Sequence, residues 1–414
     1  DPTLPGVGLV IFDEFHERSL PGDLGLAFAL DARRGLRPDL RILVMSATLD
    51  RDRIADLLGE TAPEGGSPSA PQITAEGREF PVDVLWRPRR QRDRLEPAVA
   101  GAVVDVLADS GDVLVFLPGA GEINRVAGAL GSAALPGDVD VRMLYGALSP
   151  EEQDAAIAPC PAGRRKVVLA TDIAETSLTV EGVTTVVDAG LARAPAHDAA
   201  TGMTRLITTS SSRASADQRA GRAGRTAPGV AIRLWSKMEH GTRPAFTAPD
   251  IAKVDLSGLA LELAAWGADD PAELPFVDPP PEAAWRDALA LLDRLHARDE
   301  LGLTSVGSSM VRLPLHPRLA RMVVGAKPGL AWTACCIAGL LAERDVMRGR
   351  PAEIPSDLRV RLDLLADRHR SHPAAAGHAV ARARRLAQDI ARRMDIPSGS
   401  IDVDAAGGLL SLAY

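Results

Sequence analysis

The sequence predicts an α/β protein with parallel strands, followed by a region that is mainly helical. Short apolar runs rich in β-branched residues alternate with stretches of helical spacing over residues 9–60 and again over residues 82–235. Strand–helix alternation of this kind is typical of parallel βαβ packing. Beyond about Thr247 the apolar residues recur at helical spacing instead, up to about Met394. We therefore expect two α/β parts and one helical part.

The first α/β part is short. Residues 9–12 form an apolar run that predicts a buried strand, and this run stops at two adjacent carboxylates, Asp13 and Glu14. A helix, a second buried strand and a further helix are predicted at residues 23–34, 41–45 and 51–58. These elements are too few for a complete doubly wound sheet, and the chain begins at Asp1, directly before a core strand. We expect a fragment that holds only the second half of this domain.

The second α/β part has enough elements for a complete sheet. It follows residues 62–71, which are rich in Pro, Gly, Ser and Ala and predict a linker. Strands are predicted at residues 82–86, 112–117, 140–144, 166–170, 184–188 and 230–235, and helices at residues 95–108, 121–130 and 150–158. Between Leu191 and Leu206 we expect a β-hairpin with its turn at residues 198–202.

The last part has few strand signals. Helices are predicted at residues 256–265, 283–298, 319–324, 332–342, 358–367 and 377–394. Residues 303–313 predict the short hairpin of a winged helix, and residues 409–414 predict a strand that is cut short. Three tryptophans fall on helical apolar faces, which favours core packing over base stacking: Trp266, Trp285 and Trp332.

Composition limits the classes of protein that remain. The net charge of −8 argues against a broadly basic surface but leaves a local nucleic-acid groove open. No stretch is long and apolar enough to predict a membrane span. Cys160, Cys335 and Cys336 have neither metal-ligand spacing nor a plausible disulfide framework, so the sequence predicts a reducing, cytoplasmic location.

Three stretches carry residues suited to phosphate chemistry. Asp13 and Glu14 follow a strand, where carboxylates can bind Mg²⁺ and polarise a water. Arg222 and Arg225 are three residues apart and would share one face of a helix, where both could bind a phosphate. Thr171, at a strand end, could also reach phosphate oxygens, as could Ser177 on the following turn. Acidic and arginine groups on two α/β domains suit phosphoryl transfer at the interface between those domains.

Five motifs in order resemble those of superfamily-two helicases of the DEAH/RHA group, and among them the bacterial HrpB-type helicases. They are residues 13–16 (motif II, with Phe15 in place of the usual alanine), 46–48 (motif III), 115–119 (motif IV), 170–179 (motif V) and 218–225 (motif VI). Each motif is weak alone, but five at compatible spacing identify the group.

The resemblance implies a fold and a domain order. We expect tandem RecA-like domains, the first of them incomplete, followed by a mainly helical winged-helix and ratchet-like bundle region. The expected domains are residues 1–61 (half of the first RecA-like domain), 62–71 (linker), 72–246 (second RecA-like domain), 247–317 (winged helix) and 318–414 (bundle, truncated at its C-terminus).

The resemblance also implies a function and roles for single residues. The function would be ATP-dependent helicase or translocase activity, with ATP and Mg²⁺ as cofactors and RNA, or else single-stranded DNA, as partner. Asp13 would bind Mg²⁺ and Glu14 would activate the attacking water. The other implied roles are coupling through His16, Ser46 and Thr48, catalysis by Gln218, Arg222 and Arg225, and nucleic-acid contact by Thr171, Thr176 and Ser177.

One departure from the family pattern bears on activity. The 414 residues contain no Gly-x-x-x-x-Gly-Lys-Ser/Thr loop, whose backbone amides and lysine would bind the phosphates. We therefore expect that this chain alone neither binds ATP tightly nor hydrolyses it, although its parent would be an ATPase. A non-catalytic nucleic-acid-binding or scaffolding relative remains the alternative. Arg219, within motif VI, is interpreted as a surface ion-pair residue without a catalytic role.

Overall fold

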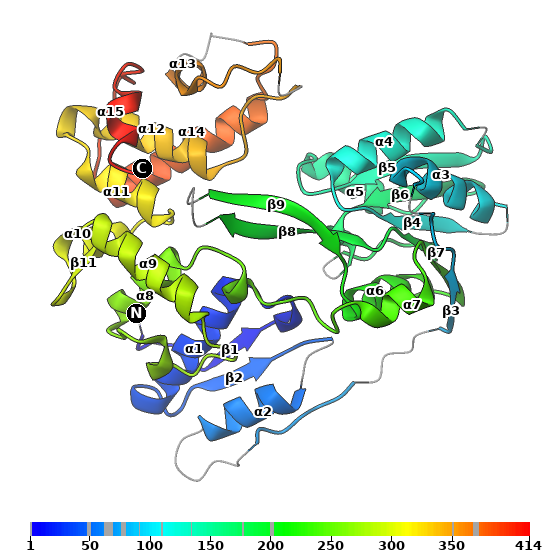
Figure 1. Ribbon diagram of the computed structural model, residues 1–414, viewed down its shortest axis with the longest axis horizontal. Helices are drawn as coiled ribbons and strands as arrows, with labels where there is room; N and C mark the ends of the chain where they lie inside the picture. The colour runs from blue at the N-terminus through cyan, green and yellow to red at the C-terminus, as the bar shows by residue number, and fades with distance from the viewer. Residues whose placement is uncertain are drawn as a thin grey trace. The chain divides into compact units, whose positions relative to one another are not determined.

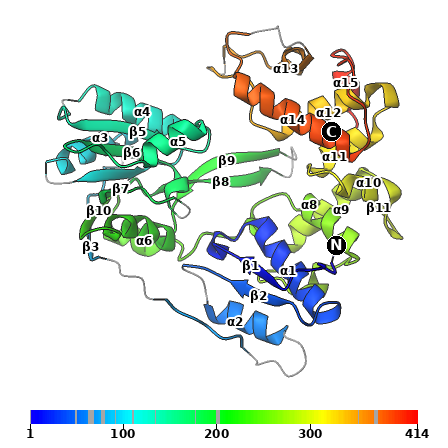
Figure 2. The same cartoon turned by 180° about the vertical axis from the view of Figure 1, so that it is seen from behind.

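The computed structural model describes residues 2–47, 51–61, 69–75, 80–90, 92–108, 111–133, 135–175, 178–198, 203–349, 352–366 and 372–414. The predicted site residues Thr48, Thr176 and Ser177 lie outside these ranges, as does most of the predicted linker. Contacts divide the chain into two compact units (Figures 1 and 2). The first unit comprises Asp1–Gly22 and Ala32–Val254, and the second comprises Asp23–Asp31 and Asp255–Tyr414.

A six-stranded sheet forms the centre of the first unit. Its order is β3-β10-β7-β4-β6-β5, and every neighbouring pair is parallel. The strands are β3 (Val82–Trp86), β4 (Asp112–Phe116), β5 (Val139–Leu144), β6 (Arg165–Ala170), β7 (Val183–Asp188) and β10 (Gly229–Arg233). The six strands predicted for the second α/β part are thus present, with bounds within two residues of those expected.

Helices cover both faces of this sheet. They are α3 (Leu95–Val106), α4 (Ala120–Gly131), α5 (Pro150–Ile157) and α6 (Arg213–Gly221), and the short helix α7 (Lys237–Thr242) follows β10. Alternate residues of β4 point to opposite faces, so Val115 packs with α3 and α4, whereas Leu114 and Phe116 pack with α5 and α6. Helix α5 begins at a capping box, in which Ser149 Oγ accepts from the Glu152 N–H while the Glu152 carboxylate accepts from the Ser149 N–H.

The first two strands form a separate small sheet. Strand β1 (Leu9–Phe12) pairs in parallel with β2 (Arg41–Val44), and the chain between them forms α1 (Leu20–Gly35), capped by Ser19 Oγ. Helix α2 (Arg51–Glu60) follows. The expectation of two buried strands is wrong, because Leu9 and Ile11 are 48% and 52% exposed. The sheet has only two strands, and one of its faces lacks a covering layer among the described residues.

The predicted hairpin is present. Strand β8 (Leu191–Asp198) pairs antiparallel with β9 (Met203–Ser210), so the second strand is four residues longer than expected. In both views the hairpin extends away from the six-stranded sheet (Figures 1 and 2). It starts directly after Gly190, which has a φ of +71° and lies so close to Trp235 that a Cβ atom would approach the indole to 2.5 Å.

The second unit is mainly helical, as predicted. Its helices are α8 (Ser257–Trp266), α9 (Glu282–Arg294), α10 (Ser305–Val311), α11 (Pro317–Gly325), α12 (Ala331–Ala342), α13 (Leu358–Ala366), α14 (Gly377–Arg393) and α15 (Ala406–Leu410). Trp266 packs as expected, since its ring stacks on Phe28 at 4.1 Å and its indole N–H donates to Asp31 at 2.8 Å. Within the ranges that the structure describes, no helix is long and apolar enough to cross a membrane.

Two predictions for this unit are wrong. Residues 303–313 form a helix rather than a hairpin, because Thr304 Oγ1 accepts from the Gly307 N–H and caps α10. The hairpin lies earlier, between β11 (Arg298–Asp299) and β12 (Gly302–Leu303). The last residues form α15 and a turn rather than a strand, since Leu409 and Ala413 are both buried, at the i, i+4 spacing of a helix.

The packing around β10 predicts that position 229 requires glycine. A Cβ atom at Gly229 would lie 2.3 Å from the Ala223 carbonyl oxygen and 2.7 Å from that of Thr184. We expect Gly229→Ala to lower the free energy of unfolding by about 3 kcal/mol, because backbone atoms on both sides would have to move. Urea unfolding followed by tryptophan fluorescence measures this, because Trp86 and Trp235 lie beside β10 and each other.

Gly128→Ala is the matched control. Gly128 lies in α4, and an added Cβ would meet no atom of a neighbouring residue within 4 Å, so alanine should raise the free energy of unfolding by up to about 1 kcal/mol. Equal urea midpoints for Gly229→Ala and the wild type would contradict the packing of β10.

Candidate functional site

The acidic turn after β1 has an unusual backbone. The Met45 N–H donates to the Phe12 carbonyl and the Phe15 N–H donates to the Met45 carbonyl, so the turn stays beside the end of β2. Phe15 is 4% exposed and fixes the short 3₁₀ helix Phe15–Glu17 by packing. Glu14 has a φ of +49°, in the left-handed region, which costs on the order of 1 kcal/mol for a residue with a side chain. The strain lies at the residue that the sequence predicts as the base.

The structure brings His16 and Gln218 together. The Gln218 Nε2 atom lies 3.0 Å from His16 Nε2, across 202 positions of sequence. With the amide donating, His16 Nε2 is the acceptor and the neutral ring carries its proton on Nδ1. That Nδ1 atom lies 3.4 Å from a carboxylate oxygen of Glu14. The contact predicted between motifs II and VI therefore exists, while its coupling role stays a prediction.

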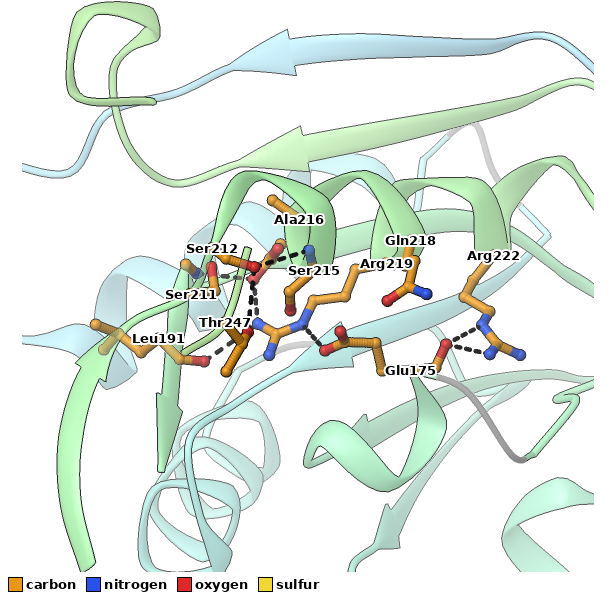
Figure 3. A network of polar contacts seen from close by, with 12 residues as sticks. Glu175, Leu191, Ser211, Ser212, Ser215, Ala216, Gln218, Arg219, Arg222 and Thr247 are labelled. Carbon is orange, nitrogen blue, oxygen red and sulfur yellow. Dashed lines mark hydrogen bonds and ion pairs between the residues drawn. The ribbon is translucent and has the colours of Figure 1, made fainter. Parts of the chain in front are cut away.

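The interpretation of Arg219 as a surface ion-pair residue is wrong. Arg219 is 2% exposed, and its guanidinium donates to Glu175 at 2.8 Å, to Asp188 at 3.1 Å and to the Leu191 carbonyl at 3.1 Å (Figure 3). It also lies over the Phe116 ring at 5.1 Å. Burial alone would lower the pKa of the guanidinium, but the charges of Asp188 and Glu175 outweigh that effect and raise it.

The two predicted phosphate-binding arginines have different surroundings. Helix α6 ends at Gly221 and Arg222 starts a 3₁₀ turn, so the pair does not share one face of an α-helix. Arg222 is 7% exposed and donates to the carbonyls of Glu175 and Leu178, both at 2.9 Å. Arg225 is exposed, and its Nη1 donates to Thr179 Oγ1 at 2.5 Å. Burial, with the charge of Arg225, lowers the pKa of Arg222 to about 10.

The remaining predicted residues lie at strand ends. Thr171 follows β6, its N–H donates to the Leu144 carbonyl of the neighbouring strand, and its carbonyl accepts from the Ala174 N–H. Ser46 is exposed two residues after β2. These positions are the carboxyl ends of parallel strands, where open α/β sheets bind ligands.

The carboxylates after β1 are the residues of this turn that could hold a metal ion. Asp13 is exposed, and its Oδ1 accepts from the Glu14 N–H at 2.8 Å. Mg²⁺ usually takes one or two carboxylates together with substrate phosphates and waters. Over the described ranges, no group of three or more His, Cys, Asp or Glu side chains could hold a metal alone. Asp13 and Glu14 could therefore hold a cation only together with ligands from outside this turn.

Sequence reasoning missed two carboxylates of the site, Glu175 and Asp188. Asp188 Oδ1 accepts both from Arg219 and from the Gly190 N–H, at 3.1 and 2.7 Å. A signal for this pair was present in α6 and the 3₁₀ turn that follows it, where a buried stripe at helical spacing consists of Ala216, Arg219, Ala220 and Ala223. A charged residue within a buried stripe requires an opposite charge nearby.

Comparisons with known proteins agree with this geometry. Residues 99–227 match the family described as "Helicase conserved C-terminal domain". The chain is 44% identical over 416 residues to the ATP-dependent RNA helicase HrpB of Escherichia coli (strain K12), an alignment that covers 100% of the chain and 48% of that relative. Over its whole length the chain is thus similar to about half of an HrpB-type DEAH/RHA helicase.

Further comparisons extend this similarity to a second relative and to the fold. The ATP-dependent RNA helicase HrpA homologue of Haemophilus influenzae is 36% identical over 85% of the chain and 27% of its own length. A crystal structure of the E. coli DEAH/RHA helicase HrpB matches with a TM-score of 0.87 and 43% identity, over 100% of this chain and 49% of that one. The chain thus spans about half the length of HrpB and a smaller share of the length of the HrpA homologue.

Proposed function

We propose that the full-length protein containing this chain is an ATP-dependent RNA helicase. The observation that carries the proposal is the contact of His16 with Gln218, which joins the acidic turn after β1 to motif VI. An acidic turn and an arginine-rich segment that meet in this way can surround a nucleotide phosphate from two sides. The relatives named above are ATP-dependent RNA helicases by their descriptions.

The residues of the chain would divide the hydrolytic step between them. Glu14 would take a proton from the attacking water, and Arg225 and Arg222 would stabilise the charge that develops on the γ-phosphate. Gln218 would keep His16 oriented. Ser46 and Thr48 would couple the state of the nucleotide to closure of the two α/β domains. Mg²⁺, bound by Asp13, would neutralise phosphate charge.

Nucleic acid would be bound through its backbone. Thr171, Thr176 and Ser177 would contact phosphates, which gives little base specificity, so single-stranded DNA remains a second substrate class to test. The hairpin β8–β9 would lie near the strand junction. Residues 247–317 would form a winged helix and residues 318–414 a ratchet-like bundle. The protein would be located in the cytoplasm.

ATP turnover by the full-length protein tests the proposal. We expect RNA to raise the rate of ATP hydrolysis, and we expect the 414-residue chain alone to hydrolyse no ATP because it contains no phosphate-binding loop. RNA binding without any turnover by the full-length protein would contradict the proposal and favour the scaffolding alternative. Turnover by the 414-residue chain would contradict the second expectation.

A further inference from the structure

Two arginines of motif VI hold the same residue, Glu175, by different groups. The Glu175 side chain accepts from Arg219 Nε at 2.8 Å, whereas its backbone carbonyl accepts from Arg222 Nε at 2.9 Å and also from Arg222 Nη2. Figure 3 shows Glu175 between the two guanidinium groups. A movement of Glu175 would therefore move the acceptor that orients Arg222.

Arg219 is suited to keep Glu175 in place. Its guanidinium is buried between Glu175 and Asp188 and donates one hydrogen bond to each carboxylate, from Nε and from Nη1. Because the guanidinium is planar and rigid, these two donors have a fixed geometry, which ties the position of Glu175 to that of Asp188. Lysine has the same charge but donates from a single point, so it cannot reproduce both contacts and the bond to the Leu191 carbonyl at once.

We propose that Arg219 is a positioning residue for ATP hydrolysis, because it fixes Glu175 and Glu175 in turn fixes Arg222. The proposal rests on the proposed function, in which Arg222 contacts the γ-phosphate. Arg219 itself is 2% exposed, and its guanidinium donates to Glu175, Asp188 and the Leu191 carbonyl. Its effect on turnover should therefore pass through Arg222 alone.

The test is RNA-stimulated ATP hydrolysis by the full-length protein with Arg219→Lys. We expect kcat to fall about 10- to 100-fold, since a displacement of about 1 Å at a catalytic group has an effect of this size, while KM for ATP changes less than about three-fold. Glu175→Gln is the second variant, to be used if Arg219→Lys does not fold. It keeps the backbone carbonyl and the size of the side chain, and we expect it to lower kcat as well.

Two buried arginines of the same domain are matched controls. Arg233 is 4% exposed and donates to the Ala216 carbonyl and to Asp217 of α6, and Arg243 is 6% exposed and donates to the Gly190 and Ser211 carbonyls at the base of the hairpin. Their hydrogen bonds thus go to other acceptors than Glu175. We expect Arg233→Lys and Arg243→Lys to lower the melting temperature but to change kcat less than about two-fold below it.

A double variant separates positioning from general destabilisation. If Arg219 acts through Arg222, then Arg219→Lys should lower kcat no further, within about three-fold, when Arg222→Lys is already present. The inference would be overturned if the kcat losses of the two single variants multiplied in the double variant. An unchanged kcat in Arg219→Lys, or kcat losses of the same size in Arg233→Lys and Arg243→Lys, would overturn it as well. In each case the proposed function would still stand. A wild-type protein without turnover would refute the proposed function and, with it, the role of Arg219.

Discussion

Glu14→Gln in the full-length protein should lower kcat for RNA-stimulated ATP hydrolysis by about 10³-fold or more. An amide cannot take the proton of the attacking water, and general-base catalysis contributes about 10²- to 10⁴-fold in rate. Glutamine keeps the size of the side chain and can adopt the same left-handed backbone at φ +49° as glutamate does. We therefore expect nucleotide binding to persist, which equilibrium binding of a fluorescent ATP analogue can measure beside the steady-state rate.

The matched control for this variant is Glu17→Gln. Glu17 is the last residue of the 3₁₀ turn that begins after Glu14, and it is exposed. Asp13 and Glu14, in contrast, directly follow β1. We expect this control to keep its turnover within about two-fold of the wild-type rate, as is usual for surface substitutions. Full turnover by Glu14→Gln would show that another group is the base.

Local patterns predicted the second α/β domain well because its strands are buried on both faces. Val113 to Phe116 are at most 1% exposed, and a continuous apolar run of this kind is the usual signature of a central parallel strand. The same signature failed for Leu9 and Ile11, which are half exposed. An apolar run indicates which side chains suit burial, but whether another layer covers them depends on residues elsewhere in the chain.

Contacts between residues of the candidate site could be predicted where the order of the motifs implies them. They could not be predicted where they depend on which residues surround the side chain in the fold. The approach of His16 to Gln218 was expected from the two motifs. The acceptors of Arg219 were not expected, because they lie 44 and 31 positions away. The buried stripe around Arg219 indicates that an opposite charge is needed, but local spacing does not say which residue supplies it.

The environments of Arg222 and Arg225 suggest a division of labour between them. Arg222 is buried and bound to backbone carbonyls, which limits its movement, whereas Arg225 is exposed and donates to the Thr179 hydroxyl. An exposed guanidinium on the second α/β domain can reach a phosphate when two such domains close around a nucleotide, as an arginine finger does. Arg225 thus suits the mobile contact, and Arg222 the fixed one.

Arg225→Lys should therefore lower kcat about 10³-fold or more, within the range of about 10³ to 10⁵ that arginine fingers contribute, without loss of stability. Lysine keeps the charge but cannot form the planar two-point contact with phosphate oxygens. The exposed side chain leaves the core unchanged, so the melting temperature should stay within about 1 °C of the wild type. Turnover and thermal unfolding of the full-length protein measure both quantities.

Arg213→Lys is the control for this variant, since Arg213 is an exposed arginine in the first turn of α6 and lies outside motif VI. It should keep turnover within about two-fold. RNA affinity of Arg225→Lys should also stay unchanged, because the arginine is assigned to the γ-phosphate and not to the nucleic-acid backbone. A parallel loss of RNA binding and turnover would place Arg225 in the nucleic-acid site instead. Retained turnover would transfer the finger role to Arg222, whose contacts to Glu175 and Leu178 would then have to open during each cycle.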